Sequence, residues 1–65
     1  MGAKYGREIR SILKRNGCKY VRAGKGDHEI WYSPITNRTI SVDIGTRNKH
    51  TANEILKAAG INYRF

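Results

Sequence analysis

The chain has 65 residues, of which 13 are Lys or Arg and 5 are Asp or Glu, so its formal net charge is +8. A chain this short is expected to form one domain, residues 1–65, and to bury only about 60% of the surface of its unfolded form, which excludes a large multidomain enzyme. The excess of positive charge attracts polyanions and makes nucleic acid the first candidate partner, ahead of an acidic protein or a basic domain that is merely soluble.

Scarce residue types exclude several further classes of protein. Cys18 is the only cysteine, so an intramolecular disulfide and a cysteine-based zinc site are excluded. The two histidines, His28 and His50, stand with few acids, so we expect metal-independent chemistry without a cofactor. We find no apolar signal-peptide region in residues 1–7 and no apolar run of membrane-spanning length. These features predict a cytoplasmic protein without a membrane partner.

Hydrophobic periodicity predicts a first helix over about residues 3–16. Apolar residues at i, i+4, i+7 and i+8 share one face, and they are Tyr5, Ile9, Ile12 and Leu13. Gly17 is typical of the left-handed residue that follows a helix. The basic residues Arg7 and Lys14 lie on the opposite face, which could follow a phosphate backbone or simply face solvent.

Three strands are predicted next, over about residues 18–23, 27–33 and 39–44. The stretch Gly24 to Gly26 forms the first turn, and Pro34, which cannot donate to a β-ladder, begins the second connection. Since the apolar faces of neighbouring strands must coincide, we expect one face to carry both strands' apolar sets. That face is predicted to hold His28, Ile30, Tyr32, Ile40, Val42 and Ile44. Glu29 then lies either opposite Asp43 or two residues away, and repulsion of like charges favours the shifted pairing.

A second helix is predicted to begin at Thr51, because Thr51 and Glu54 match a capping box. Gly60 suits the residue that follows this helix, with Ile61 packing back on Leu56. Residues 45–50 form a polar, basic loop before it, and the tail after it is either docked by its aromatic residues or frayed.

The predicted order is therefore α-β-β-β-α, an α+β fold with a three-stranded antiparallel sheet and both helices on one face. The other sheet face is expected to be open and to carry Glu29 and Trp31.

The stretch from Gly24 to Tyr32 carries the most chemistry. Its glycines permit close approach of the backbone, successive N–H groups in such a turn can bind an anion, and Lys25 adds positive charge. His28 is the side chain nearby that can exchange a proton near neutral pH. A phosphate cradle beside a proton shuttle suits cleavage of a nucleic-acid backbone, although a lone histidine is more often structural.

These residues resemble the HicA family of bacterial toxins, whose fold is like a double-stranded-RNA-binding domain. The resemblance covers nearly the whole chain and is most specific over residues 25–32 and 50–60, with Gly26-Asp27-His28 where many members carry Gly-Ser-His. It implies an mRNA interferase that cleaves RNA with His28 and is neutralised by a HicB-type antitoxin. The third strand departs from the family, which often has a proline or a histidine where this chain has Ser41 and Ile44.

Cations are expected to offset the charge that develops on the phosphoryl group. The candidates for RNA or phosphate binding are Lys25, Arg22, Arg7, Lys14, Arg47, Lys49 and His50. His50 is also a candidate second proton-transfer group, or only a residue before a helix. Asp27 is a candidate orienter of His28 only if the turn bends there, and Asp43 is expected to face away.

Trp31 is predicted to anchor the antitoxin, with stacking on RNA bases as the alternative. Two other functions remain open for the whole chain. One is a non-catalytic RNA-binding module of the same fold, and the other is a protein-interaction domain that meets an acidic partner.

Overall fold

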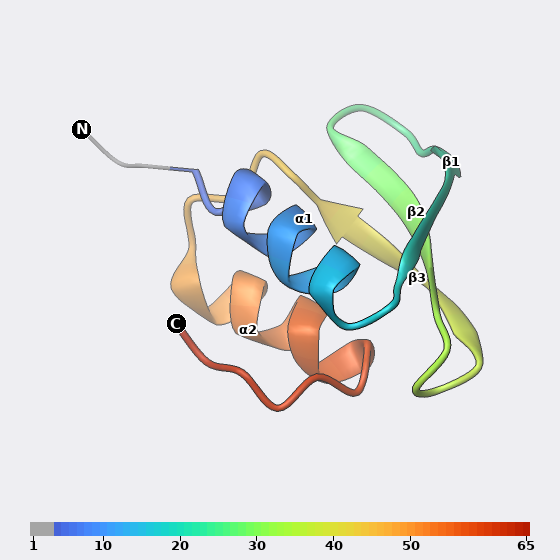
Figure 1. Ribbon diagram of the computed structural model, residues 1–65. Helices are drawn as coiled ribbons and strands as arrows, with labels where there is room; N and C mark the ends of the chain where they lie inside the picture. The colour runs from blue at the N-terminus through green and yellow to red at the C-terminus, as the bar shows by residue number, and fades with distance from the viewer. Residues whose placement is uncertain (1–3) are drawn as a thin grey trace.

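The computed structural model describes residues 4–65 and confirms the α+β order (Figure 1). Its elements are α1 (Gly6–Arg15), β1 (Lys19–Ala23), β2 (His28–Ser33), β3 (Arg38–Asp43) and α2 (Lys49–Ala58). The strands form one antiparallel sheet in the order β1-β2-β3. As predicted, α1 and α2 lie side by side on one face of this sheet. Within the described residues, neither helix has the length and apolarity needed to cross a membrane.

Helix α1 ends at the predicted glycine. Gly17 has φ +83°, and its N–H donates to the carbonyl of Lys14 at 3.1 Å. The N–H of Cys18 reaches back to the carbonyl of Leu13 at 2.9 Å, which completes a Schellman motif. This turn carries the Cys18 side chain directly into the core, where it is 4% exposed.

Helix α2 ends as predicted but begins earlier. Gly60 has φ +78°, and the N–H of Ile61 donates to the carbonyl of Leu56 at 2.9 Å. The predicted start at Thr51 is wrong, because Asn48 is the N-cap and its Oδ1 accepts the N–H of His50 at 2.8 Å. An Asn side chain caps at least as well as Thr, so the upstream cap extends the helix by three residues.

The core lies between the two helices and the sheet face that they cover. Its apolar members come from every element except β1, whose residues are all exposed. They are Ile9, Ile12, Leu13, Cys18, Trp31, Ile40, Val42, Ala52, Ile55, Leu56, Ala59 and Ile61.

The predicted orientation of β2 is wrong. Trp31 is 2% exposed and pairs with Ile40, so the odd-numbered side chains of β2 face the helices together with the apolar side chains of β3. The register places Glu29 opposite Val42, one residue away from the first predicted pairing. A slip of one residue exchanges the two faces of a strand, so His28, Ile30 and Tyr32 lie on the open face.

The contacts of Ser33 explain in part why the odd-numbered side chains of β2 face the helices. Its side chain is fully buried, and its hydroxyl donates to the carbonyl of Ala59 at the end of α2 with a distance of 2.6 Å. The same hydroxyl accepts the N–H of Ile35 at 3.3 Å. Burial of a hydroxyl that both donates and accepts a hydrogen bond costs little free energy. A polar residue can therefore occupy the helix-facing side of β2.

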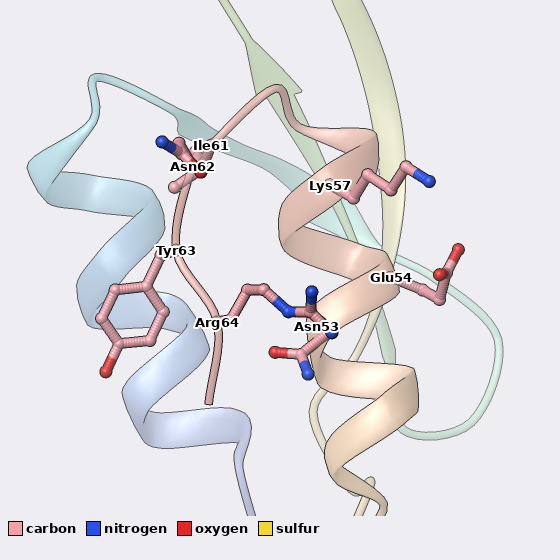
Figure 2. A pocket seen from close by; sticks show the side chains of 7 residues that line it. All are labelled: Asn53, Glu54, Lys57, Ile61, Asn62, Tyr63 and Arg64. Atoms are coloured by element: carbon pink, nitrogen blue, oxygen red, sulfur yellow. The ribbon is translucent and has the colours of Figure 1, made fainter.

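The C-terminal tail is docked. The N–H of Phe65 donates to Asn53 Oδ1 at 2.8 Å, and the Phe65 ring lies 4.9 Å from the Tyr5 ring. Between the tail and α2 is a hollow of about 310 Å³, shown in Figure 2. It is lined by Asn53, Glu54, Lys57, Ile61, Asn62, Tyr63 and Arg64.

Two glycines with positive φ give a test of packing at the end of α2. In Gly60→Ala a new Cβ would lie 2.7 Å from Ile35 Cγ2, whereas at Gly26, with φ +63°, nothing lies within 4 Å. Both alanine variants should lose about 1–2 kcal/mol for the left-handed backbone. Gly60→Ala should lose about 1–3 kcal/mol more from overpacking. Urea unfolding measures both, and equal losses would contradict the close packing at Gly60.

Candidate active site

The turn between β1 and β2 holds the start of β2 in place. The N–H of Gly24 donates to the carbonyl of His28 at 2.8 Å, and the N–H of His28 donates to the carbonyl of Lys25 at 3.2 Å. Gly26, with φ +63°, supplies a left-handed residue within the four-residue connection from Gly24 to Asp27. The result is a short connection that holds both the backbone N–H and the carbonyl of His28.

The imidazole of His28 is exposed and oriented. Its Nδ1 lies 3.0 Å from the carbonyl oxygen of Lys25. Because a carbonyl only accepts hydrogen bonds, Nδ1 carries the proton in this contact. The neutral ring therefore presents the lone pair of Nε2 to solvent, and the protonated ring presents an Nε2–H donor.

The loop after β3 meets this turn. The N–H of Ile44 donates to the carbonyl of Asp27 at 3.0 Å, and a Cβ on Gly45 would lie 2.7 Å from Asp27 Oδ2. Helix α1 starts at the same place, since a Cβ on Gly6 would overlap the Ile44 backbone. His28, the start of α1 and the start of α2 thus share one end of the fold.

Most of the predicted cations lie on elements that meet at this end. Arg7 is in the first turn of α1, Arg47 is in the loop after β3, and Lys49 and His50 are in the first turn of α2. Together with Lys25 in the turn, all are exposed. His50 was predicted to lie in the loop, and the structure corrects this by placing it inside α2.

Two of the predicted cations lie elsewhere. Arg22 is on β1 opposite Ile30, next to the open sheet face. Lys14 is in the last turn of α1, away from the end where that helix meets Ile44. Both are exposed, and Lys14 is close enough to Glu29 to lower its pKa slightly.

Asp43 is a functional candidate that sequence reasoning missed. It was expected to face away from His28, but the register pairs the two residues directly across β2 and β3, so their side chains share the open face. The error follows from the wrong orientation of β2. The signal that could have found it is Trp31, because a tryptophan in a central strand is seldom left exposed.

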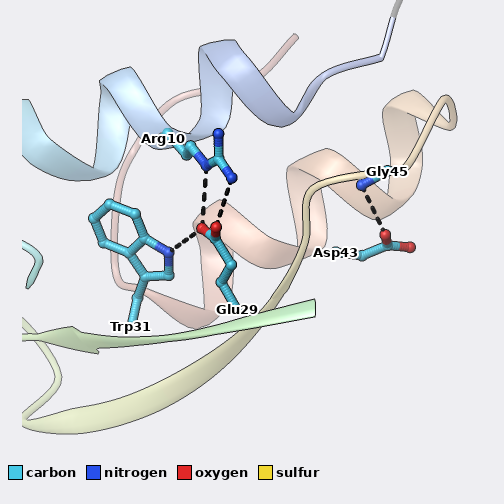
Figure 3. A network of polar contacts seen from close by, with 5 residues as sticks. All are labelled: Arg10, Glu29, Trp31, Asp43 and Gly45. Atoms are coloured by element: carbon cyan, nitrogen blue, oxygen red, sulfur yellow. Dashed lines mark hydrogen bonds and ion pairs between the residues drawn. The ribbon is translucent and has the colours of Figure 1, made fainter. Parts of the chain in front are cut away.

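Trp31 is not an exposed anchor for a partner, which corrects the predicted interface. Figure 3 shows its indole beneath α1, where Nε1 donates to Glu29 Oε1 at 3.0 Å. Arg10 of α1 holds the same carboxylate with two hydrogen bonds, from Nε to Oε1 at 3.1 Å and from Nη2 to Oε2. The Tyr20 ring of β1 packs nearly perpendicular to the Trp31 ring, with centroids 5.9 Å apart, and Tyr20 is itself 51% exposed.

The hydrogen bonds from Arg10 hold the pKa of Glu29 below its usual value, with the indole N–H adding to the effect and burial opposing it. The Glu29 side chain is 15% exposed and Arg10 is 40% exposed, so water screens this ion pair in part. Among residues 4–65, no three His, Cys, Asp or Glu side chains gather closely enough to hold a metal ion.

The ion pair predicts a pH dependence of stability. Because the folded state lowers the pKa of Glu29, its contribution is complete above the ordinary glutamate pKa and is lost as the pH falls through the lowered value. Glu29→Gln should therefore be less stable than wild type at about pH 7, and the difference should shrink toward about pH 3. Urea unfolding at several pH values checks this, with Glu54→Gln on exposed α2 surface as the control. A constant difference would contradict it.

The sequence model of the family described as HicA toxin of bacterial toxin-antitoxin matches residues 6–61. The match spans both helices and all three strands. No curated protein and no solved structure matched the chain. A family match over most of the chain, on the fold that the family resemblance implies, identifies this protein as a member of the HicA family of bacterial toxins from toxin–antitoxin systems.

Proposed function

We propose that this toxin is a metal-independent endoribonuclease, an mRNA interferase, in which His28 is the catalytic residue. The observation that carries the proposal is the oriented, exposed imidazole at the start of β2, with Nδ1–H held by the Lys25 carbonyl. This leaves Nε2 as the atom that exchanges a proton with RNA. A positioned group of this kind contributes about 10²–10⁴-fold to a rate.

The surroundings of His28 leave room for a phosphodiester. On the β1 side its partner is Gly24, where even a Cβ would come within 3.1 Å of the His28 Cβ. The lack of a side chain there keeps one flank of the imidazole open. Lys25 follows Gly24 in the chain, so an incoming phosphate meets a positive charge beside the proton-transferring nitrogen of His28.

The cations at the start of α2 favour an RNA ligand over a merely solvated surface. Lys49 is the first residue of α2, and there is no acid in the first turn. A cation at a helix N-terminus opposes the helix dipole and weakens the helix. A bound phosphate would reverse this cost, because helix N-termini bind anions. We place Arg7, Arg47 and His50 in the same RNA-binding surface, with Arg22 and Lys14 at its margins.

We further propose that a HicB-type antitoxin neutralises the toxin in the cytoplasm. Trp31 is buried and is not available to an antitoxin, so we place the contact with the antitoxin on exposed apolar side chains. Of the exposed large apolar residues, Tyr20 and Val21 are neighbours on β1 and are 51% and 50% exposed. Aromatic residues on such a surface anchor protein interfaces.

His28→Ala should abolish cleavage of mixed-sequence RNA in EDTA, with a loss of about 10²–10⁴-fold in kcat. His50→Ala should mainly raise KM, because we place His50 in binding. Gel analysis of RNA products gives the rates, and thermal unfolding checks that both variants are folded. If wild type binds RNA tightly but does not cleave it, the protein is a non-catalytic RNA-binding module and the proposal is wrong.

Lys25→Ala should weaken RNA binding and reduce the slope of log affinity against log salt concentration by about 0.7, the value for one phosphate contact with a single strand. Lys57→Ala is the matched control, since Lys57 is exposed in the last turn of α2, away from His28. Filter binding over a salt series measures both slopes. Equal changes in the two variants would show that only net charge matters.

A further inference from the structure

We propose that Asp43 is a second catalytic group, a general base that acts with His28 as general acid. This inference rests on the proposed ribonuclease function and names its nucleophile, the ribose 2′-hydroxyl. The substrate is then an RNA strand whose scissile phosphate lies over the open face of the sheet, between the ends of β2 and β3.

The register brings the two side chains close. His28 and Asp43 are direct partners across β2 and β3. The N–H of Ile44 donates to the carbonyl of Asp27, whereas the backbone N–H and carbonyl of His28 both bond toward Gly24 and Lys25 on the β1 side. His28 and Asp43 therefore occupy a non-hydrogen-bonded site, where Cα atoms are only about 4.5 Å apart and side chains are closest.

The hydrogen bonds assign different atoms to structure and to chemistry. Asp43 Oδ1 accepts the N–H of Gly45 at 3.0 Å, which anchors the half-buried carboxylate (Figure 3). In the described part of the chain, Oδ2 of Asp43 and Nε2 of His28 make no hydrogen bond. Each side chain thus has one polar atom bonded to the backbone and a second polar atom that is left for substrate.

Asp43 is not needed to orient His28. In a His–Asp couple the carboxylate holds the Nδ1–H of the imidazole, but that role belongs here to the Lys25 carbonyl. The carboxylate is therefore left for direct contact with substrate. We assign the base to Asp43 and not to Asp27, because Asp43 is the direct cross-strand partner of His28, whereas Asp27 lies in the turn before β2.

The step balances without a metal or co-reactant. Asp43 Oδ2 takes the proton of the 2′-hydroxyl as the 2′-oxygen forms a bond to phosphorus. The bond from phosphorus to the 5′-oxygen breaks, and the Nε2–H of protonated His28 passes its proton to that oxygen. The products are a 2′,3′-cyclic phosphate and a 5′-hydroxyl end, and proton exchange with water restores both residues.

This assignment makes the rate depend on two protonation states. Asp43 must be ionised and His28 protonated, so kcat/KM should follow a bell-shaped pH profile with a carboxylate limb on the acid side. Other charged groups lie on the elements around the pair. They are Arg22 on β1, Lys25 and Asp27 in the turn, Arg47 in the loop, Arg7 and Glu8 on α1, and Lys49 and His50 on α2.

The test is the pH profile of RNA cleavage in EDTA by wild type, Asp43→Asn and Asp27→Asn. Asn keeps an Oδ1 acceptor for Gly45, so Asp43→Asn preserves the observed hydrogen bond. Asp27→Asn removes the same charge from the same end of the fold. We expect Asp43→Asn to lose about 10²–10⁴-fold in kcat and the acid limb of the profile. Asp27→Asn should keep the wild-type shape, and Asp43→Glu should keep the acid limb at a lower rate.

The outcomes separate the two proposals. Absence of cleavage by folded wild type overturns the ribonuclease function itself. Cleavage that requires His28 but keeps its rate and profile in Asp43→Asn overturns only the role of Asp43. If the wild-type rate only rises with pH as the imidazole loses its proton, His28 acts as the base. That result also overturns the role of Asp43. Products without a 2′,3′-cyclic phosphate or its 2′- or 3′-phosphate hydrolysis product exclude the 2′-hydroxyl as nucleophile.

Discussion

Burial of the Trp31 indole determines which face of β2 meets the helices. A tryptophan of this size removes a large apolar area from water, and its N–H needs an acceptor once it is buried. Glu29 supplies that acceptor from the same face of the strand, and Arg10 then neutralises the carboxylate from α1. The three side chains join helix to sheet, so the orientation of β2 and the placement of α1 depend on one another.

The orientation of β2 has a direct effect on chemistry. Because side chains alternate along a strand, placing Trp31 inside turns His28 outward. It also fixes the register with β3, and the register gives His28 a carboxylate partner on the open face. The buried network and the candidate active site are thus two sides of one strand. A substitution at Trp31 would be expected to disturb both.

Local signals in the sequence were sufficient to predict where the helices end. The apolar spacing of α1 and the glycines at positions 17 and 60 predict where the helices end, because helix termination depends on neighbouring residues alone. The start of α2 was missed by three residues, since Asn48 caps it instead of Thr51. His28 and most of the basic residues around it were also singled out from the sequence, and their roles stay predictions.

The sheet orientation required contacts that the local pattern does not contain. Along β2 both faces mix polar and apolar residues, so alternation alone does not choose between them. Ser33 and Glu29 are tolerated inside only because Ala59 and Arg10, each far away in the sequence, satisfy their oxygens. Asp43 could not be assigned for the same reason, since its relation to His28 depends on the register that these distant contacts set.

The buried thiol of Cys18 offers a way to observe the motions of this fold. It lies where α1 ends and the chain enters β1, and it belongs to the same core cluster as Trp31 and Leu56. Because the residue is buried, a thiol reagent reaches it when the core around it opens or the chain unfolds. As the only cysteine in the sequence, it makes the rate of labelling a direct reporter of opening, without any added probe.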